Sequence, residues 1–78
     1  MRVTVTTSDR PGSLRRLTAL IAENGGNILQ AIHDRNSPNV KIDQTRIDFT
    51  LETRGPEQSQ ILVNALESMT ESIEVLDS

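Results

Sequence analysis

The sequence predicts an α+β sandwich, in which a four-stranded antiparallel sheet carries two helices on one of its faces. Four short segments alternate apolar and polar residues, two longer segments repeat apolar residues at helical spacing, and the order of the six is β-α-β-β-α-β. A chain of 78 residues forms one domain, 1–78. The predicted strands lie near 1–7, 27–34, 45–53 and 72–76, and the predicted helices near 11–24 and 56–69.

The first strand and the first helix are joined by a turn that contains proline and glycine. Residues 1–7 alternate between apolar and polar types, which indicates a strand with one face on the core. Because proline favours the first turn of a helix, we expect the helix to begin near Pro11. Its apolar stripe consists of Leu14, Leu17, Leu20 and Ile21. The two glycines in 24–26 should end it, since glycine adopts the left-handed cap conformation without steric cost.

The second predicted strand, 27–34, has apolar residues on both of its faces. Simple alternation places Ile28 and Ile32 on one face and Leu29 and Ala31 on the other. A strand with one solvated face would not show this pattern. Either both faces are covered, or the strand lies at a contact with a partner.

The rest of the chain repeats the pattern after an irregular stretch, 35–44. Ile47, Phe49 and Leu51 alternate with polar residues, which is typical of a strand with one buried face. A helix near 56–69 and a short last strand follow. The apolar face of that helix consists of Ile61, Leu62, Ala65, Leu66 and Met69. Right-handed crossovers then place the first and third strands in the centre of a ferredoxin-like sandwich and the other two at its edges.

Composition narrows the possible functions. The absence of cysteine excludes a disulfide scaffold, an iron–sulfur cluster and a thiolate metal site, and it fits a cytoplasmic location. Eleven acidic residues outnumber eight basic ones, so we expect no nucleic-acid partner. The one aromatic residue, Phe49, lies on the helix-facing side, where it cannot stack RNA bases. No apolar run is long enough to span a bilayer, and we expect no membrane partner.

No group of residues predicts a catalytic centre. His33 is the only histidine, and no serine or carboxylate is spaced to act with it. Lys41, the only lysine, lies in the irregular stretch, and no phosphate-binding G-x-x-x-x-G-K-[ST] motif occurs. We therefore expect a chain that is not an enzyme, with no catalytic residue, no metal and no cofactor.

The stretch that remains is Asp9-Arg10-Pro11-Gly12, with Asn27 further along the chain. It is either a strand-to-helix turn alone or a binding site for a free amino acid. A helix N-terminus offers unpaired N–H groups and a partial positive charge to a carboxylate, and Gly12 lets a ligand approach the backbone. The amide oxygen of Asn27 can accept a hydrogen bond from an ammonium group.

On these residues, the chain resembles the ACT domain, a ligand-sensing module of enzymes of amino-acid metabolism. The resemblance rests on the segments 9–14 (DRPGSL) and 26–28 (GNI) within the β-α-β-β-α-β frame. The segments 33–35 (HDR) and 51–55 (LETRG) are similar to the C-terminal regulatory ACT domain of threonine dehydratases, also called threonine ammonia-lyases.

This resemblance implies an allosteric domain whose effector is a free amino acid, bound where the loop before the first helix meets the second strand. The residues that it implies are Asp9, Arg10, Pro11, Gly12, Ser13 and Leu14 in the loop and Asn27 and Ile28 on the strand. A branched-chain amino acid is the expected effector, with Leu14 and Ile28 near its side chain. Any ammonia-lyase activity would lie in a separate catalytic domain of a parent enzyme.

The alternative function is that of a ligand-free dimerisation module with the same fold. For both functions we expect a homodimer through the second strand and the first helix, because pairing would satisfy the free backbone groups of an edge strand and cover its apolar residues.

Overall fold

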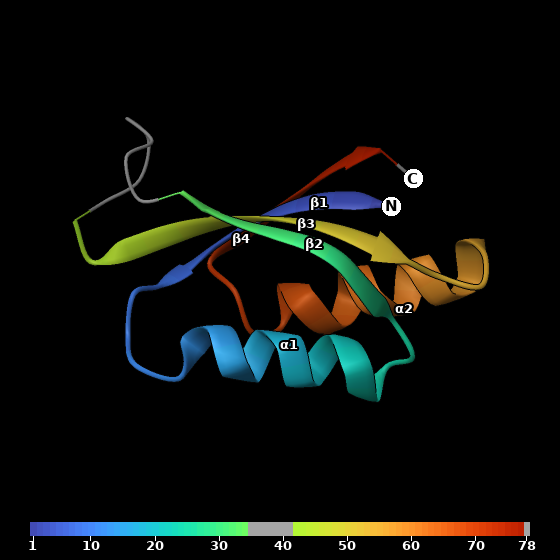
Figure 1. Ribbon diagram of the computed structural model, residues 1–78, viewed down its shortest axis with the longest axis horizontal. Coiled ribbons are helices and arrows are strands. Elements are labelled where there is room, and N and C mark those ends of the chain that lie inside the picture. Colours follow the sequence, from blue (N-terminus) through green and yellow to red (C-terminus); the bar gives the residue numbers. More distant parts are fainter. Residues whose placement is uncertain (35–41, 78) are drawn as a thin grey trace.

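The computed structural model describes residues 1–34 and 42–77. Its elements are β1 (Arg2–Ser8), α1 (Ser13–Glu23), β2 (Asn27–Asp34), β3 (Gln44–Glu52), α2 (Pro56–Glu67) and β4 (Ser72–Asp77). The strands form one antiparallel sheet in the order β2-β3-β1-β4, and both helices lie against the same face of it (Figure 1). The predicted ferredoxin-like sandwich is confirmed, with β1 and β3 in the centre.

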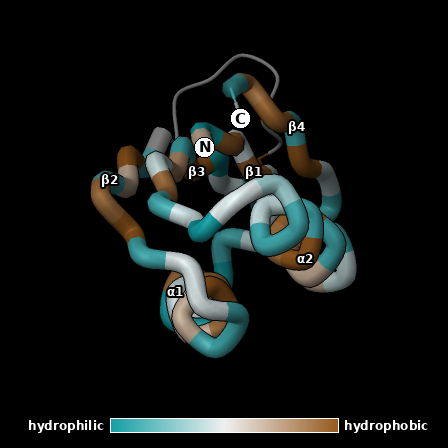
Figure 2. The backbone as a smooth tube through the Cα atoms, turned by 90° about the vertical axis from the view of Figure 1, so that its right-hand side faces the viewer, coloured by the Kyte–Doolittle hydropathy of each residue, from teal (hydrophilic) through white to brown (hydrophobic). Residues whose placement is uncertain are grey.

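The view along the strands shows the sheet as one layer and the two helices as the other (Figure 2), and the buried cluster draws its residues from both layers. Val3 of β1 is opposite Phe49 of β3, and Val5 is opposite Ile47. These side chains and that of Leu51 are at most 1% exposed, which confirms the predicted register of β3. The helices contribute four more side chains that are at most 1% exposed: Leu17, Ile21, Leu62 and Leu66.

The apolar face of α2 is narrower than predicted. Leu62 and Leu66 lie one turn apart and are buried, whereas Ile61 is 53% exposed. Successive residues of a helix are about 100° apart around its axis, so Ile61 lies beside the buried stripe rather than on it. Met69 follows the end of α2 and is also exposed.

Helix α1 begins at Ser13, two residues later than predicted. Gly12 has a φ of 87°, a left-handed conformation that a right-handed helix cannot include. Pro11 and Gly12 form a turn instead, which the amide of Ser13 closes by donating to the carbonyl of Arg10 at 3.1 Å. The turn thus leads directly into the N-terminus of the helix.

Strand β2 contains a bulge that the alternation did not predict. Ile28 is opposite Leu51 of β3, but the next residue of β3, Thr50, is opposite Gln30 rather than Leu29. Leu29 is therefore an extra residue without a partner in the ladder.

This bulge changes which side chains of β2 share a face. Residues directly opposite in a ladder point to the same side of the sheet. Ala31 is opposite the buried Phe49, so it faces the helices, as Ile28 does, while Ile32 lies on the open face of the sheet. The prediction that Ile28 and Ile32 share a face is wrong, because the extra residue shifts the alternation by one position.

The predicted irregular stretch falls largely outside the described residues, which leave out 35–41 and with them Arg35 and Lys41. At its end, Ile42 and Asp43 form a turn. The carbonyl of Asp43 accepts a hydrogen bond at 2.9 Å from the amide of Asp9, so this turn is tied to the β1–α1 turn. Within 1–34 and 42–77, no helix has the length and apolar character needed to cross a bilayer.

Candidate functional site

The β1–α1 turn closes a hollow between α1 and the sheet, with a volume of about 350 Å³. We call it the loop pocket. All six residues of the predicted loop, 9–14, line it. The sheet contributes His33 from β2 and Thr45 and Ile47 from β3. The structure therefore brings the loop residues together at one cavity.

The N-terminus of α1 supplies hydrogen-bond donors to the loop pocket. The amide of Ser13 donates a hydrogen bond to the carbonyl of Arg10, but the amides of Gly12 and Leu14 have no partner among the described residues. Within 1–34 and 42–77 no side chain caps this helix, and its first turn contains no acidic residue. The partial positive charge of the helix end therefore remains available to an anion.

Gly12 determines the shape of the turn. Its φ of 87° is left-handed, and a side chain at this position would be strained. A Cβ atom placed on Gly12 would meet no atom within 4 Å, so the space beside its backbone is open. The approach of a ligand at Gly12 stays a prediction, and this open space leaves room for it.

The sheet lines the pocket with Ser8, His33, Thr45 and Ile47, and one polar group of this wall lacks a hydrogen-bond partner in the described part of the chain. Ile47 is buried, and His33 lies opposite it on the helix-facing side but is exposed at the sheet edge. Thr45 is only 2% exposed, and its Oγ1 has no hydrogen-bond partner in the described part of the chain. Sequence reasoning missed Thr45, although the alternation that includes Ile47 extends to it.

Asn27 and Ile28 lie at the other end of β2 from the loop pocket. Asn27 is opposite Glu52, and its Nδ2 donates to Oε1 of Glu52 at 3.3 Å. Asn27 is separated from His33 by about 20 Å along β2, because each residue of a strand advances the chain by roughly 3.3 Å. A single chain therefore does not combine the two predicted strand residues with the predicted loop.

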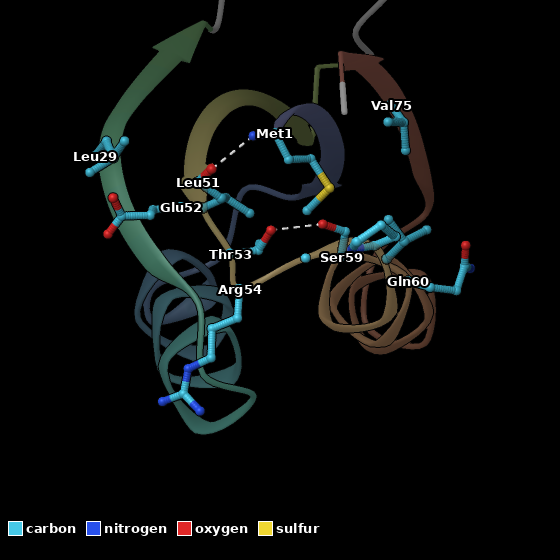
Figure 3. Close-up of a pocket in the computed structure, with 12 residues that line it drawn as sticks. Met1, Leu29, Leu51, Glu52, Thr53, Arg54, Ser59, Gln60 and Val75 are labelled. Atoms are coloured by element: carbon cyan, nitrogen blue, oxygen red, sulfur yellow. Dashed lines mark hydrogen bonds between the residues drawn. The ribbon is translucent and has the colours of Figure 1, made fainter.

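A larger hollow, of about 700 Å³, lies at that other end, beside Met1 and the β3–α2 connection (Figure 3). Several of its polar groups are already paired within the chain. The amino group of Met1 donates to the carbonyl of Leu51 at 2.9 Å, and the hydroxyls of Thr53 and Ser59 are 2.8 Å apart. With unpaired amides and an unpaired hydroxyl, the loop pocket is the better candidate for a polar ligand.

Comparison with known proteins gives family matches over nearly the whole chain. The sequence profile of the ACT domain matches residues 1–76. An L-threonine ammonia-lyase of Geobacter sulfurreducens is 37% identical over 76 residues, which are 97% of this chain and 19% of that protein. An L-threonine ammonia-lyase of Thermotoga maritima is 42% identical over 45 residues, 58% of this chain and 11% of that protein. The chain thus spans a fifth or less of these relatives.

Solved structures share the fold at low sequence identity. A quorum-quenching acylase, GqqA, has a TM-score of 0.77 at 17% identity, over 96% of this chain and 27% of that one. The ACT domain of a GTP pyrophosphokinase from Chlorobium tepidum has a TM-score of 0.71 at 15% identity, with 94% and 91% covered. The ligand-free regulatory subunit of aspartate kinase from Thermus thermophilus has a TM-score of 0.66 at 17% identity, with 95% and 49% covered.

Proposed function

Since this chain belongs to the ACT-domain family, we propose that it is a regulatory domain that binds a free amino acid in the loop pocket. The observation that carries the proposal is the N-terminus of α1, where backbone amides without a partner among the described residues meet a cavity. The relatives named above include two L-threonine ammonia-lyases and a regulatory subunit of aspartate kinase, and an amino-acid effector suits such enzymes.

In this proposal the carboxylate of the amino acid accepts hydrogen bonds from the amides of Gly12 and Leu14. Asp9 lines the same pocket, and in this proposal the ammonium group lies on the side of its carboxylate. The side chains of Leu14 and Ile47 form apolar walls that suit a branched aliphatic side chain. Ile28, expected at this position, lies at the far end of β2 in the same chain.

A second copy of the chain would bring Asn27 and Ile28 to the pocket. Strand β2 lies at the edge of the sheet, and two of its apolar residues, Leu29 and Ile32, are 59% and 50% exposed. Antiparallel pairing of β2 with the β2 of a two-fold related partner places the start of one strand beside the end of the other. The Asn27 end of the partner then approaches His33, which lines the pocket. We infer a homodimer in which each site takes residues from both chains.

We further propose that the domain regulates a larger enzyme, such as a threonine ammonia-lyase, whose catalytic activity lies in a separate domain. The chain matches only 19% and 11% of the length of two L-threonine ammonia-lyases, which supports the proposal of a separate catalytic domain. The absence of cysteine supports a cytoplasmic location. The alternative, a ligand-free dimerisation module, is favoured by the same exposed edge strand.

A charge at Ser13 tests the position of the carboxylate. Ser13→Asp places a negative charge beside the proposed carboxylate and should weaken amino-acid binding by about ten-fold or more in calorimetric titration. The same charge suits a helix N-terminus, so the variant should unfold at the same temperature as the wild type or higher. Ser13→Asn, of similar size but uncharged, is the matched control and should bind nearly as the wild type does.

Two outcomes would contradict the proposal in different ways. A wild-type domain that binds none of the twenty amino acids at millimolar concentration supports the dimerisation module instead. Equal binding by wild type, Ser13→Asp and Ser13→Asn would place the carboxylate away from α1.

A further inference from the structure

The hydroxyl of Thr45 is a buried polar group without a partner. Its residue is 2% exposed, and Oγ1 finds no hydrogen bond among residues 1–34 and 42–77. Few buried polar groups in native proteins are left unpaired, and each requires a physical explanation. Thr45 is opposite Thr7 in the ladder and points, like Ile47, to the helix-facing side.

The position of this hydroxyl connects it to the ligand site. Thr45 lines the loop pocket from the sheet side, while Gly12 and Leu14 line it from the helix side. Ile47 and Leu14 contribute apolar surface to the same pocket, beside the polar side chains of Ser8, Ser13 and His33. A molecule whose carboxylate is held at α1 would therefore extend its side chain toward the sheet, where the hydroxyl of Thr45 lies beside the apolar side chain of Ile47.

We propose that Thr45 hydrogen-bonds a hydroxyl on the side chain of the effector, so that the site selects a β-branched hydroxy amino acid of the threonine type. This inference rests on the proposed function. Threonine and valine have nearly the same shape and differ in replacing a methyl group by a hydroxyl. Both fit between Leu14 and Ile47, but only threonine can pair the hydroxyl of Thr45.

The expected selectivity follows from the cost of the unpaired group. A site built to hydrogen-bond a hydroxyl rejects an analogue without it, because the polar groups of the site are then buried unpaired. For one buried hydrogen bond between neutral groups, this corresponds to about ten-fold in affinity.

Calorimetric titration of L-threonine and L-valine into three versions of the chain tests the inference. The wild type should bind threonine about ten-fold more tightly than valine. Thr45→Val, which is isosteric, should lose this preference, and Thr45→Ser, which keeps the hydroxyl, should retain it. Thermal unfolding should show Thr45→Val to be at least as stable as the wild type, because the variant removes an unpaired buried hydroxyl.

The outcomes separate this inference from the function on which it rests. Wild-type binding without preference for threonine, or a preference that survives in Thr45→Val, overturns the role of Thr45 and leaves the amino-acid site intact. Absence of binding for every amino acid overturns both.

Discussion

Gly25 determines where α1 ends. Its φ of 80° is left-handed, and its amide donates to the carbonyl of Ala22 at 3.0 Å. The amide of Gly26 donates to the carbonyl of Ile21 at 2.9 Å. Together these bonds form a Schellman motif, which pairs two of the last carbonyls of the helix and turns the chain toward β2.

Replacement of Gly25 by alanine should lower the free energy of unfolding by about 1–2 kcal/mol, because the left-handed conformation costs alanine but not glycine. Gly25→Asn is the control, since asparagine adopts this conformation more readily. Both variants add a Cβ atom toward the side chain of Gln58, so their difference isolates the backbone effect. Urea denaturation measures it, and an equal loss in the two variants would show that contact with Gln58, not conformation, decides the outcome.

At single positions, the sequence predicted the end of α1 and the loop residues that line the pocket, but it missed Thr45. The cap at Gly25 follows from glycine's conformational freedom, and it was predicted correctly. Proline suggested a helix start at Pro11, but the left-handed φ of Gly12 delays it to Ser13. In the sequence, Thr45 is an ordinary strand threonine. Its burial and its unpaired hydroxyl depend on α1, the β1–α1 turn and β3 coming together, which local patterns do not describe.

Among the elements, β2 is where alternation failed. A period of two assumes one residue for each position of the ladder, and nothing in the composition of 27–34 indicates that Leu29 is an extra one. β1 and β3 followed their predicted faces because their ladder pairs residues one to one. β4 has a second irregularity, since Val75 and Asp77 pair with the successive residues Val3 and Arg2 of β1. In the single chain, Leu29 and Ile32 of this edge strand are both half exposed or more. The contact with a partner stays a prediction.

A charge on the edge strand should disrupt the proposed homodimer. Ile32→Lys removes apolar area from the contact in both copies, brings two like charges toward the two-fold axis, and should weaken dimerisation about ten- to hundred-fold. Ile61→Lys is the control, because Ile61 is similarly exposed, at 53%, but lies on α2. Sedimentation equilibrium measures both. A wild type that stays monomeric at high concentration, or equal weakening by both substitutions, would argue against β2 as the interface.

For the whole molecule, the order of elements was enough to predict the fold. Six segments with clear periods and two right-handed crossovers leave few arrangements, and the sheet order β2-β3-β1-β4 is the expected one. The strand directions also carried information about the site that the sequence interpretation did not use. Because β1 and β2 both pair antiparallel with β3, they run in the same direction. The turn that follows β1 and Asn27 at the start of β2 must therefore lie at opposite ends of the sheet.

This separation predicts complementation: two variants that each fail to bind the effector should form a mixed dimer that binds it. Ser13→Asp damages the loop half of the proposed site and Asn27→Ala the strand half. In a dimer of one copy of each, one site would carry both changes and the other site neither. At a concentration where neither variant alone binds the effector, their mixture should bind it, and calorimetric titration would detect this. If the mixture does not bind the effector, each chain binds its ligand alone. If binding is recovered, the site is formed by residues of two polypeptides.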